Sequence, residues 1–369
     1  MTTNQNIPNG ENGSENSRIL RKVPKFDKQG ITKSAKTDIY SQQKIMTLSN
    51  DGFLKRLPIS VYRFQHHRGK GIIGILTRET DAMKLLCIAD PFETLLLFTD
   101  NGKVFSLKWH EIPIEASSEA KGMAITALLH IAGGEKVTAL AAVPDLEQSY
   151  AQLMYGSPNV IGFNIVDTDI KKEYFLLMAT EKGEIKKTSL KLFSSIRSSG
   201  IIAMDIEEGD KLVAACVTAD SDDDVILVTE QGQSIRFAVN SLRNSSRTSG
   251  GVRAIHLNEG DKLVGMSVVA LETHLLVVTV NGYGKLTPVE HYKRQRRGGV
   301  GIKTLKVSDK SGKVGAARLV NQDQYLMLVA KYGVVISTRI KEVIGRTAQG
   351  VLMMRIEEGD RVSAVAAWD

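Results

Sequence analysis

The sequence contains few of the residues from which disulfides, metal sites and stacking surfaces are built. Only two of its 369 residues are cysteines, Cys87 and Cys216, and neither belongs to a paired motif. Disulfides and a structural zinc site are therefore not expected. Aromatic residues make up 6% of the chain and are scarce in its basic segments, which argues against a surface that stacks on single-stranded bases.

Long apolar runs are also missing. No stretch approaches the roughly 20 apolar residues that a membrane-spanning helix needs. The N-terminus, MTTNQNIPNGENGSENS, has no apolar core of the kind found in signal peptides. We therefore expect a cytoplasmic protein.

The chain does contain an excess of positive charge, and this charge is unevenly distributed. There are 48 Lys and Arg against 41 Asp and Glu, a formal net charge of +7. Residues 1–36 hold seven of the cations, three acidic residues and few large apolar groups. Such a composition cannot offset the entropy of ordering the chain. We predict a disordered basic tail over residues 1–36, acting as a linker or as an arm that touches phosphates.

From Lys44 onward the chain repeats itself. Six times an apolar run, a glycine-containing turn and a second run follow one another, as in TLLLFTDNGKVFSL and HLLVVTVNGYGKLT. This pattern predicts a β-hairpin, since such turns need a residue with positive φ. The turn glycines, spaced by 50, 81, 49, 50 and 51 positions, are Gly52, Gly102, Gly183, Gly232, Gly282 and Gly333. The one long interval predicts an insertion at 144–172.

Each hairpin is followed by a polar segment, a second glycine and another apolar run. The second glycines are Gly71, Gly122, Gly200, Gly251, Gly301 and Gly350. Three repeats then share an acidic turn, at 207–210, 258–261 and 357–360, before a final strand rich in small residues. Six four-stranded units with little helical periodicity predict an all-β fold, a six-bladed propeller-like β-pinwheel over residues 37–369. Two β-sandwich domains would also fit the length, but would not require six units in a common register.

The most basic segment lies in the fifth repeat. Tyr-Lys-Arg-Gln-Arg-Arg-Gly-Gly-Val-Gly occupies residues 292–301 and places four cations within five residues, directly before a glycine run. A related copy at 62–71 keeps the tyrosine, the glutamine and the closing glycine. Glycine puts no side chain between the backbone and a ligand, so such a loop suits a polyanion.

Equivalent segments in a ring of blades lie on one rim, so their cations would form a continuous band. Five of the six polar segments are basic, whereas the second is mainly acidic, with three glutamates against Lys121. A basic band suits the backbone of duplex DNA, which is contacted without sequence information. The residues predicted to contact DNA, or to shape that contact, are Lys293, Arg294, Gln295, Arg296, Arg297, Gly298, Gly299, Gly301, Arg63, Gln65, Arg68, Lys70, Arg197, Arg243, Arg247 and Arg346.

Other kinds of site find little support in the sequence. The glycine run at 298–301 lacks the Lys-Ser/Thr of a nucleotide-binding P-loop. His66 and His67 have no acidic or cysteine partner at a spacing suited to a metal. The acidic turns lack the alternating oxygen ligands of a calcium loop, so we interpret them as β-turns. We expect no catalytic residues, no metal and no cofactor.

Several of these segments together resemble one known family. QRRGGVG at 295–301 resembles the signature box, usually written QRRGGKG, of the gyrase A C-terminal domain. FLKRLPISVYR at 53–63, ATEKGEIKKTSL at 179–190, SSIRSSGIIAM at 194–204 and the acidic turns extend the resemblance from about residue 37 to residue 369. It implies a six-bladed β-pinwheel that wraps duplex DNA around its rim, as part of a type IIA topoisomerase, DNA gyrase, that supercoils DNA.

The resemblance also implies partners. A core built from the gyrase A N-terminal region and gyrase B would cleave the DNA and use ATP, and the protein would be associated with the nucleoid. The family's nucleophilic tyrosine lies in an Arg-Tyr-Thr-like sequence, and none of the nine tyrosines here has that context. We therefore expect no enzymatic activity from this chain alone. It would be a free-standing DNA-wrapping protein or an accessory component of a separately encoded core.

Two departures from the family pattern bear on wrapping. In the family the box falls in the first blade, where this chain reads Gln-His-His-Arg-Gly-Lys-Gly at 65–71, and in the fifth repeat Val300 replaces its lysine. The strength and hand of wrapping stay open, as do gyrase-like or topoisomerase IV-like behaviour and a closed ring or an open spiral. The alternative from a different class is a propeller used as a protein-docking platform, which would show aromatic or apolar side chains on one rim.

Overall fold

The structure of the chain is a computed structural model that describes residues 44–58, 72–73, 81–89, 93–115, 117, 120–144, 173–219, 222–339 and 343–368. The chain divides into two units, Met1–Asp38 and Ile39–Asp369, and all described residues belong to the second. The predicted tail at 1–36, the copy of the basic box at 62–71 and the predicted insertion beyond Pro144 lie outside the described residues.

Six β-hairpins supply the two middle strands of each of the six sheets. Their strands are β1 Lys44–Ser49 and β2 Phe53–Pro58, β5 Glu93–Thr99 and β6 Lys103–Lys108, β9 Phe175–Thr180 and β10 Glu184–Ser189, β13 Asp224–Thr229 and β14 Gln233–Ala238, β17 His274–Thr279 and β18 Tyr283–Pro288, and β21 Tyr325–Ala330 and β22 Val334–Thr338. The six predicted turn glycines all have positive φ, from 77° to 87°, which L side chains rarely adopt. The predicted hairpins are confirmed.

A third, inner strand pairs antiparallel with the first strand of each hairpin. The inner strands are β4 Met83–Ala89, β8 Val137–Pro144, β12 Leu212–Thr218, β16 Leu263–Val269, β20 Val314–Val320 and β24 Val362–Trp368. In the third repeat the Asp210 carboxylate accepts hydrogen bonds from the backbone N–H of Lys182 at 3.0 Å and of Lys211 at 2.7 Å. Asp261 and Asp360 make the equivalent bonds. The acidic sequences are therefore turns, as predicted. Each precedes an inner strand in the chain, and its aspartate ties the start of that strand to the hairpin turn by hydrogen bonds.

The fourth, outermost strand of each sheet comes from the following repeat. The outer strands are β7 Met123–Ala124, β11 Ile201–Ile202, β15 Val252–Arg253, β19 Ile302–Lys303, β23 Val351–Leu352 and β3 Ile72–Ile73. The sheet orders run from β4-β1-β2-β7 in the first sheet to β24-β21-β22-β3 in the sixth. The repeat seen in the sequence and the blade of the structure are therefore offset by one strand.

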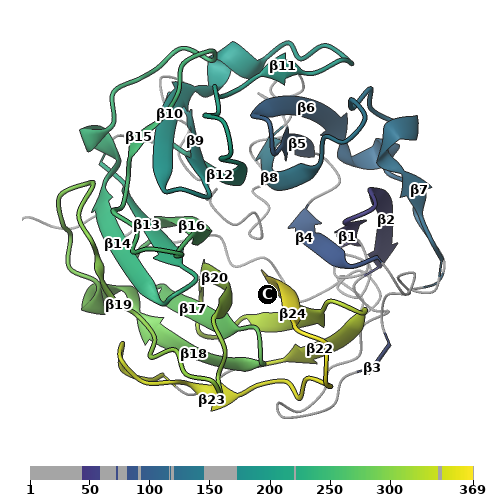
Figure 1. Cartoon of the computed structure of the whole chain (residues 1–369). Coiled ribbons are helices and arrows are strands. Elements are labelled where there is room, and N and C mark those ends of the chain that lie inside the picture. Colours follow the sequence, from purple (N-terminus) through teal and green to yellow (C-terminus); the bar gives the residue numbers. More distant parts are fainter. Residues whose placement is uncertain are drawn as a thin grey trace, which may run out of the picture. The chain divides into compact units, whose positions relative to one another are not determined.

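The second unit closes on itself. β3 of the first repeat pairs with β22 of the last, and β24 packs against β4. The inner strands β4, β8, β12, β16, β20 and β24 contact one another in that order. The six sheets therefore form a closed ring rather than a spiral or a pair of sandwiches (Figure 1).

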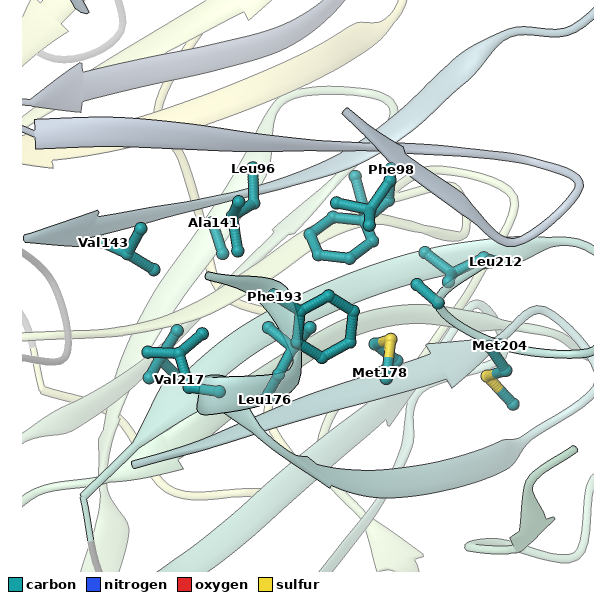
Figure 2. Close-up of a cluster of buried hydrophobic side chains, with 14 residues drawn as sticks. Leu96, Phe98, Ala141, Val143, Leu176, Met178, Phe193, Met204, Leu212 and Val217 are labelled. Atoms are coloured by element: carbon teal, nitrogen blue, oxygen red, sulfur yellow. The ribbon is translucent and has the colours of Figure 1, made fainter. Parts of the chain in front are cut away.

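The hydrophobic core lies between neighbouring sheets. In Figure 2, Leu96 and Phe98 of β5 face a cluster that includes Leu176 and Met178 of β9. A matching cluster joins the last sheet to the first, with Met327 and Trp368 packed with Ile45. Because each sheet buries both faces against its neighbours, no blade is stable alone. Among the described residues the only helices are 3-10 turns of three or four residues, and none could cross a membrane.

Candidate nucleic-acid interface

The predicted site residues that the structure describes lie on the stretches that lead from a hairpin to the next outer strand. We call these stretches crossing segments, because each leaves its own sheet and joins the preceding one. Their described parts in the second to sixth repeats are 109–115 with 117 and 120–122, 190–200, 239–251, 289–301 and 343–350. Isolated parallel bridges tie them to the second hairpin strand of the preceding sheet, pairing Arg56 with Ile114, Lys187 with Asn244, Arg236 with Arg294 and Leu286 with Val343. The crossing segments and outer strands together are called the rim below.

The crossing segment of the fifth repeat is anchored by a tyrosine. It starts with a 3-10 turn at Val289–His291, and Tyr292 follows with only 1% of its surface exposed. The Tyr292 hydroxyl lies 2.6 Å from the hydroxyl of Thr304, and burial raises the pKa of the tyrosine. The tyrosine of the basic box is therefore a packing residue that places Lys293 and the arginines after it.

The four cations of this segment differ in their surroundings. Arg294 forms an ion pair with Asp224 at 2.8 Å, and the same carboxylate pairs with Arg236 at 2.7 Å. Lys293 and Arg296 are exposed. The structure thus brings the predicted cations together, but part of the charge of Arg294 is balanced within the chain.

Three predicted arginines bind the backbone of the rim itself. The guanidinium of Arg297 donates to the carbonyl of Arg253 at 2.5 Å. Arg247 donates to Ile202 at 3.1 Å and Arg346 to Lys303 at 2.7 Å. Each of these crossing segments lies over the sheet of the preceding repeat, and its arginine bonds the outer strand of the sheet one further back. Arg297 of the fifth segment, for example, bonds β15 of the third sheet. These half-buried arginines hold the rim together, and each guanidinium has further N–H donors.

Two of the glycines after the arginines, Gly298 and Gly301, have positive φ, which favours glycine there. Gly301 has a φ of 73°, and a Cβ there would lie 2.4 Å from the carbonyl oxygen of Ser234. The amide of Gly298 donates to Ala254 at 2.7 Å. Backbone conformation therefore accounts for Gly298, and backbone conformation with close approach to the preceding sheet accounts for Gly301, even without a ligand.

The remaining predicted residues fall into two groups. Arg197 and Arg243 are exposed on the third and fourth crossing segments, and Gln295 is half-buried on the fifth. Arg63, Gln65, Arg68 and Lys70 lie outside the described residues.

The sequence of the ring is similar to that of known proteins. The family model described as DNA gyrase C-terminal domain, beta-propeller, matches residues 43–83, 93–144, 174–218, 223–270, 273–321 and 324–369. The chain belongs to this gyrase A C-terminal domain family. It is 41% identical over 343 residues to the gyrase A protein of Dehalogenimonas lykanthroporepellens, covering 90% of this chain and 39% of that protein. The gyrase A protein of Staphylococcus epidermidis is 36% identical over 332 residues, covering 89% of this chain and 34% of that protein.

Solved structures of such domains share the fold. The DNA gyrase A C-terminal domain superposes with a TM-score of 0.73 at 22% identity, over 89% of this chain and 100% of the other. The C-terminal domain of DNA topoisomerase IV gives 0.61 at 20% identity, over 89% and 93%. The resemblance to the gyrase A C-terminal domain and the six-bladed fold are thus confirmed. The chain spans less than half the length of the curated relatives described above.

Sequence reasoning missed several rim cations of this gyrase-type domain. Arg253 and Lys303 are exposed on the outer strands β15 and β19, beside Arg297 and Arg346. Lys306 and Arg355 are exposed shortly after outer strands. All of them follow a second glycine by a few residues, whereas the predicted cations all precede one. The repeat pattern could have revealed them, because the outer strand continues along the same rim.

A second missed group is buried under the rim. Lys55, Lys186 and Lys285 are between 0% and 3% exposed. Burial lowers the pKa of each ammonium group to about 8. The sequence did contain a signal for them. Each lysine lies in a hairpin strand of the first, third or fifth repeat, at a position that is apolar in the second, fourth and sixth repeats.

Proposed function

We propose that the chain binds duplex DNA without regard to sequence and wraps it around the rim. The observation that supports this proposal most directly is the repetition of exposed cations on successive crossing segments. Arg197, Arg243 and Arg296 occupy the third, fourth and fifth segments, and each segment lies on the sheet before its own. A ring that exposes an arginine on several successive crossing segments suits a polyanion that curves around it.

The physical chemistry of DNA agrees with such a rim. Duplex DNA presents one charge per ~1.7 Å of its axis, and neutralising it releases counterions regardless of sequence. Bending a site of 20–30 bp costs on the order of 1–6 kcal/mol, so contacts spread over several blades are needed to hold the bend. A deep pocket for a base is not required.

Membership in the gyrase A C-terminal domain family connects this binding to DNA topology. We propose that the chain acts as the wrapping part of a type IIA topoisomerase, together with a core of the gyrase A N-terminal region and gyrase B. Cleavage and ATP use would belong to that core, so the chain would not be an enzyme by itself. Its place would be at the nucleoid in the cytoplasm.

A topology assay tests the proposal. Relaxed circular DNA is incubated with increasing amounts of the protein and a relaxing topoisomerase, then freed of protein and separated on a gel. We expect a linking-number change that grows with protein, and its sign gives the hand of the wrap. Binding without a linking change would refute wrapping, and absence of binding would refute the whole proposal.

One observation favours a second function. Apolar side chains on the rim are exposed: Ile202 by 47%, Val252 by 45% and Val300 by 60%. Covering exposed apolar side chains with a partner removes apolar surface from water, so the same rim could dock a protein partner. A docking platform would bind its partner in a salt-tolerant way, whereas DNA binding weakens steeply as salt rises.

A further inference from the structure

Three buried lysines occupy one position in alternate sheets. Lys55, Lys186 and Lys285 each stand three residues after the turn glycine of the first, third and fifth hairpins. In the second, fourth and sixth hairpins the same position holds Phe105, Ile235 and Ile336, all buried. The ring therefore alternates between a cation and an apolar side chain beneath its rim.

The lysine ammonium groups bind the crossing segments that lie over them. Nζ of Lys186 donates to the carbonyls of Arg247 at 2.7 Å, Ser249 at 2.8 Å and Ala203 at 2.8 Å. The three acceptors match the three N–H donors of an ammonium group. Two of the three acceptors belong to the fourth crossing segment, including the carbonyl of the rim residue Arg247 itself.

The same arrangement recurs two sheets further round the ring. Nζ of Lys285 donates to the carbonyl of Gly345 at 2.8 Å and to the carbonyl of Arg346. Arg346 stands four residues before its second glycine, as Arg247 does. In the first sheet, Lys55 donates to the carbonyl of Ala120 on the second crossing segment at 2.6 Å. In each case the acceptors include carbonyls on the segment of the next repeat.

We propose that Lys186 and Lys285 are positioning residues for DNA binding, and that Lys55 plays the same part in the first sheet. They hold the backbone of the crossing segments so that Arg247 and Arg346 lie in place on the rim. This inference rests on the proposed DNA-binding function. The lysines themselves are buried and would not touch phosphate.

The environment of the lysines supports a positioning role. Desolvation lowers the pKa of Lys186 to about 8, opposed by Asp205 and assisted by Arg247. Desolvation also lowers the pKa of Lys285 to about 8, assisted by Arg346. Among the described residues neither ammonium forms an ion pair with a carboxylate, so backbone carbonyls are their hydrogen-bond partners. A buried ammonium group that forms no ion pair is costly for stability. The need to fix the carbonyls of the crossing segments gives a reason for this cost.

The apolar sheets hold their crossing segments in another way. A Cβ on Gly200 would lie 2.8 Å from the ring of Phe105, and one on Gly299 would lie 3.8 Å from Ile235. The third and fifth crossing segments thus bring a glycine close to the apolar side chain beneath them. An apolar residue at this position is compatible with the fold, so replacing a buried lysine by methionine is a fair test.

The test compares Lys186→Met, Lys285→Met and a control, Lys211→Met. Lys211 is exposed directly after the acidic turn at 207–210, so the control removes the same charge without touching the rim. Amide hydrogen exchange is measured over 243–251 and 343–350, with 193–200 and 293–301 as internal references. We expect faster exchange over 243–251 alone in Lys186→Met and over 343–350 alone in Lys285→Met. DNA affinity should fall severalfold in both, and not in the control.

The exchange measurement needs no DNA, which separates this inference from the proposed function. If the parent chain failed to bind DNA, the proposed function would fall, while the exchange data would still decide whether the lysines order the rim. Unchanged exchange, or an equal increase in all four segments, would overturn the positioning role. If Lys186→Met does not fold, Lys186→Gln and Lys285→Met answer the same question independently.

Discussion

Arginines that look alike in the basic box of the fifth repeat have different surroundings. Arg296 is exposed, whereas Arg294 is paired with Asp224 and Arg297 donates to a neighbouring carbonyl. A charge already balanced within the chain releases fewer counterions when it meets a phosphate. We therefore expect the contribution of each cation to the proposed DNA binding to be set by its partners rather than by its place in the motif.

Replacement of Arg296 by alanine is predicted to weaken DNA binding equally on all sequences. Loss of one phosphate contact should reduce the slope of log affinity against log salt by about 0.9. The same change at Arg294 should have a smaller effect, because its ion pair with Asp224 already offsets its charge. Fluorescence anisotropy on unrelated duplexes over a salt series measures both. An equal effect of the two variants would contradict this ranking.

At the scale of the element, the crossing segment depends on close approach to the preceding sheet. After Gly301 the chain forms β19, which pairs with β14 through Ser234 and Gln233. The positive φ of Gly301 and its distance from the Ser234 carbonyl leave no room for a side chain. The proposed DNA-contacting surface is thus attached to the sheet at a point where only glycine fits.

Gly301→Ala is predicted to lower the free energy of unfolding by about 1–3 kcal/mol, because its positive φ is strained for alanine. The close contact should also disturb the β19 pairing and reduce DNA affinity. Gly299→Ala is the matched control, since the nearest atom to its Cβ would be 3.6 Å away. Denaturant unfolding of both variants measures the difference. Similar losses of stability in the two would show that the close contact is not decisive.

At the scale of the whole molecule, the closed ring places the rims of consecutive sheets next to one another. The inner strands contact in sequence and the last sheet packs on the first. A long duplex would therefore meet several crossing segments in turn, whereas a short one would meet only one or two. Wrapping and simple binding can therefore be measured separately, because holding a bend needs several contacts whereas binding a short duplex needs only one or two.

The double variant Arg197→Ala, Arg243→Ala is predicted to lose wrapping more than binding. Both residues are exposed, on the third and fourth crossing segments, so their loss interrupts the band in the middle of the ring. The linking-number change on circular DNA should fall sharply, while affinity for a duplex spanning one segment should fall severalfold at most. Lys211→Ala controls for exposed charge. A parallel fall in both measurements would argue against a continuous wrap.

Much of the candidate site could be predicted from the sequence. The basic segments were assigned to one rim because they recur at the same place in each repeat, and Arg197, Arg243 and Arg296 do lie exposed on successive crossing segments. The ion pair of Arg294 could not be predicted, since Asp224 belongs to another repeat. The buried lysines were missed because their acceptors are far away in the chain: Lys186 and Ser249 are 63 positions apart.

The sequence by itself determined the hairpins, the number of repeats, the family and the excess of positive charge. These features are local, because a glycine with positive φ or a run of arginines is written in a few neighbouring residues. Only the tertiary structure decided that each outer strand joins the preceding sheet, that the ring closes through β3 and β24, and which cations are balanced or buried. Those outcomes depend on packing between residues of different repeats, and a repeating pattern looks the same whichever neighbour each strand joins.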